Sequence, residues 1–589
     1  VEFGVYLLVG VLLEETQFYQ PPVTRRHVRE VILELFAVLV VDDALFGRSL
    51  VRRGIDVSRP ACRGGVYLQV VAPFAHEVDE GVTINKNVKE RETKMGKIGF
   101  DNEKYLNMQS EHIRERMAQF GGKLYMEFGG KLFDDYHASR VLPGFQPDSK
   151  LQMLLKLKDQ AEIVIAVSAS AIDQHKKRGD IGITYDQEVL RLIDLFRSVG
   201  LYVGSVVITQ YQGQQSADGF IKRLGDLGVA AYRHYMIEGY PANIPLIVSE
   251  DGFGKNDYIP TERSLIVVTA PGPGSGKMAT CLSQLYHEHQ RGIKAGYAKF
   301  ETFPIWNIPL KHPVNLAYEA ATADLNDVNM IDPFHLEAYG KVAINYNRDV
   351  EIFPVLQTIF KTISGTSPYQ SPTDMGVNMA GNCIFDDEAV KKAAREEMIR
   401  RYYIALCEQK KGKENKAEIS KLEMLLNQEG LSAADYAVAV AAKTTEEETG
   451  EPAAAIELPD GRIVTGKNKA LLGAASAMLL NALKALADIP DDEHLLASEV
   501  IRPVQELKVN YLGNHNPRLH TDEVLVALSV SAASNENAKK ALDCLPMLKN
   551  CNAHCSVILS SVDTDIFRRL RINLTCEPKY QNKKLFHNN

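Results

Sequence analysis

Residues 271–280, which read PGPGSGKMAT, combine the residue types that bind a phosphate group in many nucleotide enzymes. In such a loop the backbone N–H groups of a glycine-rich turn and a helix start converge on the anion, and a lysine adds positive charge. The predicted cofactor-binding residues are Gly272, Gly274, Ser275, Gly276, Lys277 and Thr280. An apolar run at 265–268 precedes the turn and a helical pattern follows it, which is the required order.

This stretch departs from the standard motif G-x-x-x-x-G-K-[ST] at two positions. Pro271 stands where the first glycine belongs, and Met278 replaces the hydroxyl residue that would ligate Mg²⁺. A tight turn that lets a strand and a helix pack closely would explain the glycines without any ligand. We favour phosphate binding, because three glycines and a lysine exceed what a turn needs. The expected ligand is ATP or another nucleotide with Mg²⁺, or a phosphorylated metabolite.

Two carboxylates follow the apolar triplet at 246–248, which is predicted to be a short strand. Glu250 and Asp251 would then lie at a strand end, where a metal ligand or a base beside a phosphate loop is found. They precede the loop in the chain, whereas the usual order places them after it. We predict them as catalytic residues, and a polar strand exit is the alternative interpretation.

The segment at 324–335 concentrates Asp324, Asp327, Asp332 and His335. Carboxylate oxygens bind divalent cations, although this spacing matches no known loop, including the EF-hand. Asp332 and His335 are the predicted metal ligands, and aspartates that cap short helices would explain the segment equally well. The sequence CNAHC at 551–555 is expected to contain buried free thiols rather than a zinc site.

A further polar segment follows the first predicted strand. It contains Asp134, Asp135, His137 and Arg140. In an open parallel sheet the loops at the carboxyl ends of the strands line the ligand crevice, so these side chains are candidates for ligand contact. A surface loop is the alternative.

Apolar and amphipathic segments alternate between residues 95 and 325. Strands are predicted at 123–128, 162–167, 201–209, 246–248, 265–268 and 294–300, with helices between them. Near-continuous apolar strands are typical of a parallel sheet covered by helices on both faces, so we predict an α/β domain. A mainly helical region is predicted at 326–445. An α+β domain is predicted at 446–589, with a hairpin at Pro459-Asp460-Gly461 and strands at 524–530 and 556–559.

The composition is that of a globular protein with several domains. Of the 589 residues, 45% are hydrophobic and 24% are charged. The net charge of −8 argues against a nucleic-acid binder, and the opening apolar stretch is shorter than the roughly 20 residues of a membrane span. Eight cysteines without a CxxC pair favour a reducing cytoplasm. A homo-oligomer is compatible with all of this.

Residues 1–94 differ in composition from the rest of the chain. Before Ile84 there is no Lys, Asn, Met or Trp, whereas Arg occurs eight times, and Lys and Asn become frequent after Met95. We expect Met95 to be the native start and residues 1–94 to be translated upstream sequence. A genuine N-terminal domain is the alternative, and mass spectrometry of the native protein distinguishes the two.

From Met95 to about Lys579 the chain resembles the bacterial family called domain of unknown function 1846, or uncharacterised protein family 0371. Four stretches carry the resemblance, and they lie at 127–145, 267–288, 299–340 and 371–381. The resemblance implies a soluble bacterial protein with an α/β domain, a helical region and an α+β domain. It assigns no catalytic residue, so the functional roles rest on the residues themselves.

Three functions are compatible with these features. The first is an enzyme, a nucleotide-dependent transferase or ligase, that performs phosphoryl or acyl-phosphate chemistry at the loop at 271–280. The second is a non-catalytic sensor of a phosphorylated ligand, which the missing hydroxyl at Met278 favours. The third is a metal-assisted hydrolase built on the segment at 324–335.

Overall fold

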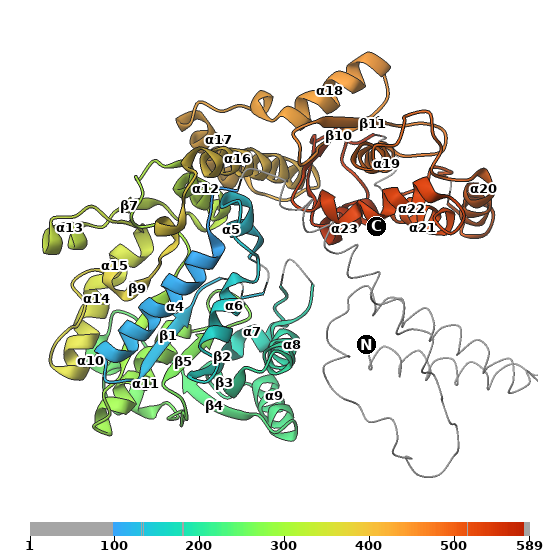
Figure 1. Ribbon diagram of the computed structural model, residues 1–589. Coiled ribbons are helices and arrows are strands. Elements are labelled where there is room, and N and C mark those ends of the chain that lie inside the picture. The colour runs from blue at the N-terminus through green and yellow to red at the C-terminus, as the bar shows by residue number, and fades with distance from the viewer. Residues whose placement is uncertain (1–97, 131, 134, 179–181, 515, 582–589) are drawn as a thin grey trace, which may run out of the picture. The chain divides into compact units, whose positions relative to one another are not determined.

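Seven parallel strands form the main sheet of the computed structural model, which describes residues 98–581 except 131, 134, 179–181 and 515 (Figure 1). Their spatial order is β4-β3-β2-β5-β1-β6-β9. The strands are β1 (Leu124–Phe128), β2 (Ala161–Ser168), β3 (Tyr202–Tyr211), β4 (Ala230–Tyr235), β5 (Leu265–Thr269), β6 (Gly296–Phe300) and β9 (Gly376–Val377). The upstream segment predicted at 1–94 lies outside the described residues.

The central strands β1, β2, β5 and β6 are buried along their whole length. Their apolar side chains alternate between two cores, because successive residues of a strand point to opposite faces. One core contains Leu124 and Met126 with side chains of α4 (Asn102–Gln119), α6 (Ser149–Lys156), α7 (Ala169–Asp173), α8 (Tyr185–Ser198) and α9 (Gln215–Asp226). The other contains Tyr125 with side chains of α10 (Ile244–Ile247), α11 (Lys277–Gln290) and α14 (Asn347–Ser364). The predicted α/β fold with helices on both faces is thus confirmed.

Strands β1 and β5 lie side by side, and the chain leaves them in opposite directions. After β1 it passes through α5 (Tyr136–Val141) and α6 to β2, beyond β5. After β5 it passes through α11 to β6, beyond β1. Such a reversal opens a crevice at the carboxyl ends of the two strands, where open α/β sheets bind their ligands. The glycine-rich turn follows β5 directly and therefore lies at this crevice.

Three predicted strands are wrong. The triplet at 246–248 belongs mostly to helix α10, which begins beside Pro245 and buries Ile247. The segment at 524–530 lies within helix α21 (Thr521–Ser531), whose buried Val524, Ala527 and Leu528 have helical spacing. At 556–559 the chain has already left strand β12 (Asn552–Cys555). Short apolar runs fit both kinds of element, and packing decides between them.

Beyond residue 325 the chain is mostly helical and also completes the main sheet. Its elements are β7 (Asn329–Ile331), α13 (Pro333–Tyr339), β8 (Ile344–Tyr346), α14, α15 (Pro372–Met375), β9, α16 (Asp387–Lys410), α17 (Lys416–Gln428) and α18 (Ala437–Thr449), and α12 (Pro313–Ala321) precedes them. Strand β9 pairs with β6, so a piece of the sheet lies beyond the range 95–325 that was predicted to contain it.

A second, mixed sheet forms the C-terminal part. Its order is β11-β10-β12-β13, where β10 (Ala453–Glu457) and β11 (Ile463–Lys467) form the predicted hairpin and β13 (Asn573–Cys576) pairs parallel to β12. Its helices are α19 (Ala474–Leu486), α20 (Ser498–Glu506), α21, α22 (Glu536–Asp543) and α23 (Ser561–Arg569). Helix α16 reaches this sheet, because the Cys407 thiol donates a hydrogen bond to the Cys576 carbonyl at 3.1 Å. The predicted C-terminal α+β architecture is confirmed.

The cysteines that the structure describes are all free, and all except Cys576 are buried. In the segment CNAHC, the fully buried His554 shares a 2.8 Å hydrogen bond with the Thr575 hydroxyl. Among the helices of the described part, none is both long enough and apolar enough to cross a bilayer.

Candidate phosphate-binding site

The glycines of the loop between β5 and α11 are required by its backbone geometry. Gly274 and Gly276 have φ angles of 76° and 79°, in the left-handed region that other residues rarely adopt. A Cβ atom at Gly276 would also lie 3.0 Å from the Thr209 side chain. At Gly272 a Cβ atom would lie 2.2 Å from the hydroxyl oxygen of Tyr185. The loop therefore keeps its backbone close to two neighbouring elements.

The two predicted hydroxyl residues of the loop hold its shape. The Ser275 hydroxyl donates to the Gly272 carbonyl at 2.9 Å, and the Thr280 hydroxyl donates to the Gly276 carbonyl at 3.0 Å. Both side chains are buried. Ser275 and Thr280 thus have partners within the loop and the start of α11.

The start of α11 presents a row of N–H groups. The first hydrogen bond of the helix runs from the Thr280 N–H to the Gly276 carbonyl at 2.9 Å. Among the described residues, none accepts a hydrogen bond from the N–H groups of residues 274–279. The first turn of α11 carries no acidic residue, so the positive end of the helix dipole is not neutralised from within the helix. These features together favour an anion.

A pocket of about 470 Å³ opens beside this loop, within the size range of small-molecule sites. Its walls are formed by Phe128, Gly130, Leu132, Phe133, Arg178, Tyr185, Glu188, Arg191, Leu192, 269–273 and Lys277. Glu188 is buried and accepts hydrogen bonds from Arg191 at 2.7 and 2.8 Å. Arg178 forms an ion pair with the same carboxylate. Two arginines thus share one acid in a wall that also contains Lys277.

Glu127 is the acidic partner of the loop lysine. It ends the apolar part of β1, the strand next to β5, where it pairs in register with Val268. Its carboxylate lies 3.9 Å from the Lys277 ammonium and accepts a 2.9 Å hydrogen bond from the Tyr297 hydroxyl. In phosphate-loop enzymes an acid on a neighbouring strand holds Mg²⁺ at this place. The prediction from the sequence missed Glu127, although the run LYME at 124–127 carries the signal.

A buried network of charges extends from Glu127 along the same face of the sheet. Lys299 of β6 is the register partner of Glu127. Its ammonium lies 2.8 Å from Glu301 and also contacts the Asp349 carboxylate and the Tyr346 hydroxyl. The site therefore contains a compensated but strongly desolvated group of charges behind Lys277.

Burial and neighbouring charges shift the pKa values of this network. Burial raises the pKa of Glu301 to about 7, although the Lys299 ammonium opposes the rise. Burial acts to lower the pKa of Lys299, but Asp349 and Glu301 outweigh it and raise that pKa well above its usual value. Lys299 is therefore charged at neutral pH, whereas Glu301 exchanges its proton in the neutral range.

The predicted catalytic residues Glu250 and Asp251 lie away from the loop. They follow helix α10, not a strand, and both side chains are exposed. The Glu250 carboxylate accepts a 2.8 Å hydrogen bond from Tyr286. Tyr286 lies more than two turns along α11 from Lys277, about 13 Å at 1.5 Å per residue. The structure does not bring these two carboxylates to the loop, and Glu127 stands in the place predicted for them.

The predicted metal ligands Asp332 and His335 have protein partners. Asp332 is fully buried and caps α13, where one carboxylate oxygen accepts from the N–H groups of Phe334 and His335 at 3.0 Å each. Its other oxygen accepts from the Thr373 N–H and hydroxyl at 3.2 and 2.6 Å. His335 shares a 3.1 Å hydrogen bond with Ser371. Among the described residues, no group of three or more His, Cys, Asp or Glu side chains could hold a metal ion.

The described residues of the polar segment after β1 contact other parts of the protein. Asp134 lies outside the described residues. Asp135 caps α5 and lies 2.8 Å from the Lys150 ammonium. His137 and Arg140 both contact Glu397 of α16, so they belong to a different cluster from the loop.

Comparison with known proteins identifies the family of this chain. The model described as domain of unknown function DUF1846, N-terminal, matches residues 98–430, and its C-terminal counterpart matches 434–586. The chain belongs to the DUF1846 family. A UPF0371 protein of Streptococcus pyogenes serotype M3 is 56% identical over 492 residues, which are 84% of this chain and 100% of that protein. A UPF0371 protein of Streptococcus thermophilus is 57% identical over the same shares of the two chains.

These matches confirm the family resemblance that the four sequence stretches indicate. The boundary between the two DUF1846 models falls at 430–434, between α17 and α18. The loop, Lys277 and Glu127 all lie within the N-terminal model. The names of these relatives state no activity.

Proposed function

We propose that this protein is an enzyme that binds a nucleotide or another phosphorylated metabolite at the crevice between β1 and β5. The observation that carries the proposal is one arrangement of groups around Lys277. Lys277 lines the 470 Å³ pocket, and its ammonium lies 3.9 Å from the Glu127 carboxylate. It also begins α11, and the N–H groups of residues 274–279 have no hydrogen-bond acceptor among the described residues. Phosphoryl or acyl-phosphate chemistry, as in a nucleotide-dependent transferase or ligase, is the reaction class that uses this arrangement.

In this proposal the loop N–H groups and Lys277 hold the phosphate. The N–H groups supply directional hydrogen bonds, and the ammonium supplies charge that the single contact to Glu127 at 3.9 Å leaves largely available. Arg191, which is about one-third exposed, contributes further positive potential to the pocket. These residues fit a phosphorylated ligand, because each of them stabilises negative charge.

Mg²⁺ would be held by Glu127 in the proposed enzyme. Met278 cannot supply the usual hydroxyl ligand, and its side chain packs against the core on the α11 face. Among the described residues, Glu127 is the carboxylate that contacts Lys277, and a bound Mg²⁺ would neutralise the charge of the transferred group. Glu301, with a pKa of about 7, would adjust the charge of the network beside Glu127 as pH changes.

The experiment that tests this proposal measures ATP and pyrophosphate binding by isothermal titration calorimetry, with and without Mg²⁺. We expect Lys277→Ala to weaken the binding of both probes and Glu127→Gln to remove only the dependence on Mg²⁺. Lys222→Ala, an exposed lysine of α9, is the matched control and should bind as the parent protein does. Equal affinities in all four proteins would refute the proposal.

A sensor without catalytic activity is the second candidate, and the packing of Met278 favours it. A sensor binds the same probes through Lys277 but releases no product. Phosphate release measured over mixtures of metabolites with ATP and Mg²⁺ separates the two functions. A cytoplasmic location is part of both proposals, and the free thiols of the described cysteines support it.

A further inference from the structure

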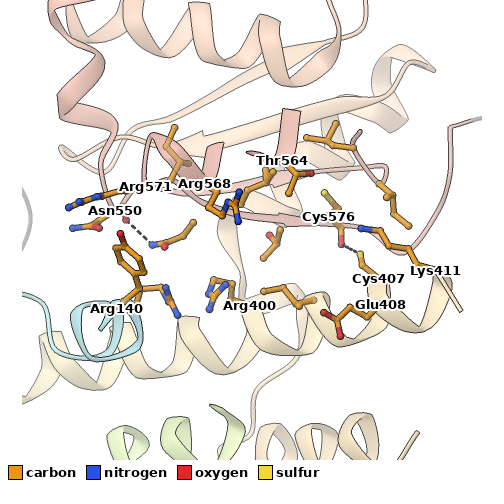
Figure 2. Close-up of a pocket in the computed structure, with 18 of the residues that line it drawn as sticks. Arg140, Arg400, Cys407, Glu408, Lys411, Asn550, Thr564, Arg568, Arg571 and Cys576 are labelled. Carbon is orange, nitrogen blue, oxygen red and sulfur yellow. Dashed lines mark hydrogen bonds between the residues drawn. The ribbon is translucent and has the colours of Figure 1, made fainter. Parts of the chain in front are cut away.

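A second pocket, of about 400 Å³, is lined by residues from both the N-terminal and the C-terminal DUF1846 regions (Figure 2). Its lower wall is made by Tyr136, Ser139, Arg140, Arg400, Ile404, Cys407, Glu408 and Lys411 of α5, α16 and the residue after it. Its upper wall is made by Asn550, Ile558, Leu559, Thr564, Arg568 and 571–576. The first set lies in the N-terminal DUF1846 region and the second in the C-terminal one.

The walls of this pocket carry a marked excess of positive charge. Its cationic residues are Arg140, Arg400, Lys411, Arg568 and Arg571, whereas Glu408 is its acidic residue. Figure 2 shows Arg140 and Arg400 rising from the lower helices and Arg568 and Arg571 on the opposite wall. Arg568 forms a 3.1 Å ion pair with Asp565, and the cations of the two walls still outnumber the carboxylates that they contact.

The lower arginines are held in place by one buried carboxylate. Glu397 accepts hydrogen bonds from Arg140 at 2.8 and 3.3 Å and from Arg400 at 2.6 and 2.8 Å. Arg401 donates one further hydrogen bond to the same carboxylate at 2.9 Å. One negative charge therefore faces three positive charges. Two of these three guanidinium groups line the pocket.

The pKa values of this cluster follow from the same imbalance. Burial acts to raise the pKa of Glu397, but the three arginines hold it well below its usual value. Burial and the neighbouring Arg400 lower the pKa of Arg140 to about 10. Both groups thus remain charged near neutral pH, so the pocket keeps its excess of positive charge.

The upper wall holds two residues in the left-handed backbone region. Asn550 and Arg571 have φ angles of 67° and 59°, and the Asn550 N–H donates to the Arg571 carbonyl at 2.8 Å. Arg571 follows the end of α23, where glycine is the usual residue. Its guanidinium lies over the Tyr136 ring, 5.7 Å from the centroid, and so spans the two walls. A strained backbone that presents a cation to a cavity is typical of a functional position.

We propose that this pocket binds a small organic phosphate. Guanidinium groups match the geometry of phosphoryl oxygens and bind them with paired hydrogen bonds. The apolar side chains of Ile404, Ile558 and Ile572 line the same cavity and would contact the organic part of the ligand. Because the two walls come from the two family regions, the bound ligand stabilises them against separation. The site is independent of Lys277 and of the function proposed for the loop.

The test uses phenyl phosphate as the probe and the full chain as the receptor, with binding measured by calorimetry. We expect the double variant Arg568→Gln/Arg571→Gln to bind phenyl phosphate at least tenfold more weakly than the parent protein. Arg569→Gln is the matched control, because this exposed neighbour on α23 lies outside the pocket. Lys411→Gln, on the opposite wall, is a second variant in case the double variant does not fold, and it should also weaken binding.

Measurement in the Lys277→Ala background separates this pocket from the loop. We expect phenyl phosphate to bind Lys277→Ala protein with the affinity of the parent, and to raise the unfolding temperature of both. Two results would overturn the proposal. One is binding that is lost in Lys277→Ala, which would assign the probe to the loop. The other is binding that Arg569→Gln weakens as much as the pocket variants do, which would indicate non-specific attraction.

Discussion

Replacement of Lys277 by alanine removes the charged side chain that the glycine-rich loop contributes to its pocket. The lysine is mostly buried, with 16% of its side chain exposed, and its ammonium lies 3.9 Å from the Glu127 carboxylate. It has room to move toward a bound phosphate without breaking a short ion pair. The substitution therefore removes a contact to the ligand more than a contact within the protein.

The size of the effect follows from the environment of the ammonium. A charge-assisted hydrogen bond in a partly desolvated site contributes about 1.5–3 kcal/mol. Since about 1.4 kcal/mol is a factor of ten, Lys277→Ala should weaken phosphate-ligand binding about tenfold to a hundredfold. Without ligand, the loose pair with Glu127 is lost, but so is the repulsion between a cation and the start of α11. The free energy of unfolding should change little, because the Glu127 carboxylate keeps its 2.9 Å hydrogen bond from Tyr297.

The assay is a calorimetric titration of ATP and of pyrophosphate, combined with urea unfolding of each ligand-free variant. Lys277→Arg keeps the charge and should retain most of the affinity, whereas Lys222→Ala controls for a general loss of positive charge. The reasoning is refuted if Lys277→Ala binds both probes as tightly as the parent protein. The glycine-rich stretch would then be a turn that packs a strand against a helix.

Further predictions concern the groups around the lysine. Gly276→Ala should destabilise the fold by about 1–3 kcal/mol, because φ is 79° and Thr209 is close, whereas Gly274→Ala faces open space and should cost less in urea unfolding. Met278→Ser should lower the unfolding free energy by about 1–2 kcal/mol, since Met278 packs on the core; an unchanged value would place it in solvent. For Glu301, the pKa is raised from 4.5 to about 7, so the native state binds the extra proton between these values. Its contribution to stability is full below pH 4.5 and is lost as pH rises toward 7, by up to about 3 kcal/mol. Glu301→Gln should flatten this slope in urea unfolding at pH 5 and pH 8, and a parallel slope would contradict the assignment.

The apolar runs of the central strands were sufficient to predict the α/β class. Strands β1, β2, β3, β5 and β6 all contain β-branched or aromatic residues. Their continuous apolar character requires both faces to be covered, which is a local property of the residues. The loop could also be predicted from the sequence, because its strand, its glycines, its lysine and its helix follow one another directly in the chain. Strand β4 was missed, since its edge position leaves it only partly buried.

Tertiary structure decided which acid belongs to the loop. Glu127 and Lys277 are separated by 150 residues in the chain, and they meet only because β5 inserts between β1 and β2. Glu250 is much nearer in sequence, but α10 places it against Tyr286. The order of the strands depends on contacts between distant segments, so it cannot be predicted from a short stretch of sequence. The second pocket could not be predicted from the sequence for the same reason, because its two walls come from distant segments. The residues thus determined the central strands and the glycine-rich loop, and the packing of distant strands and helices determined the partners of Lys277.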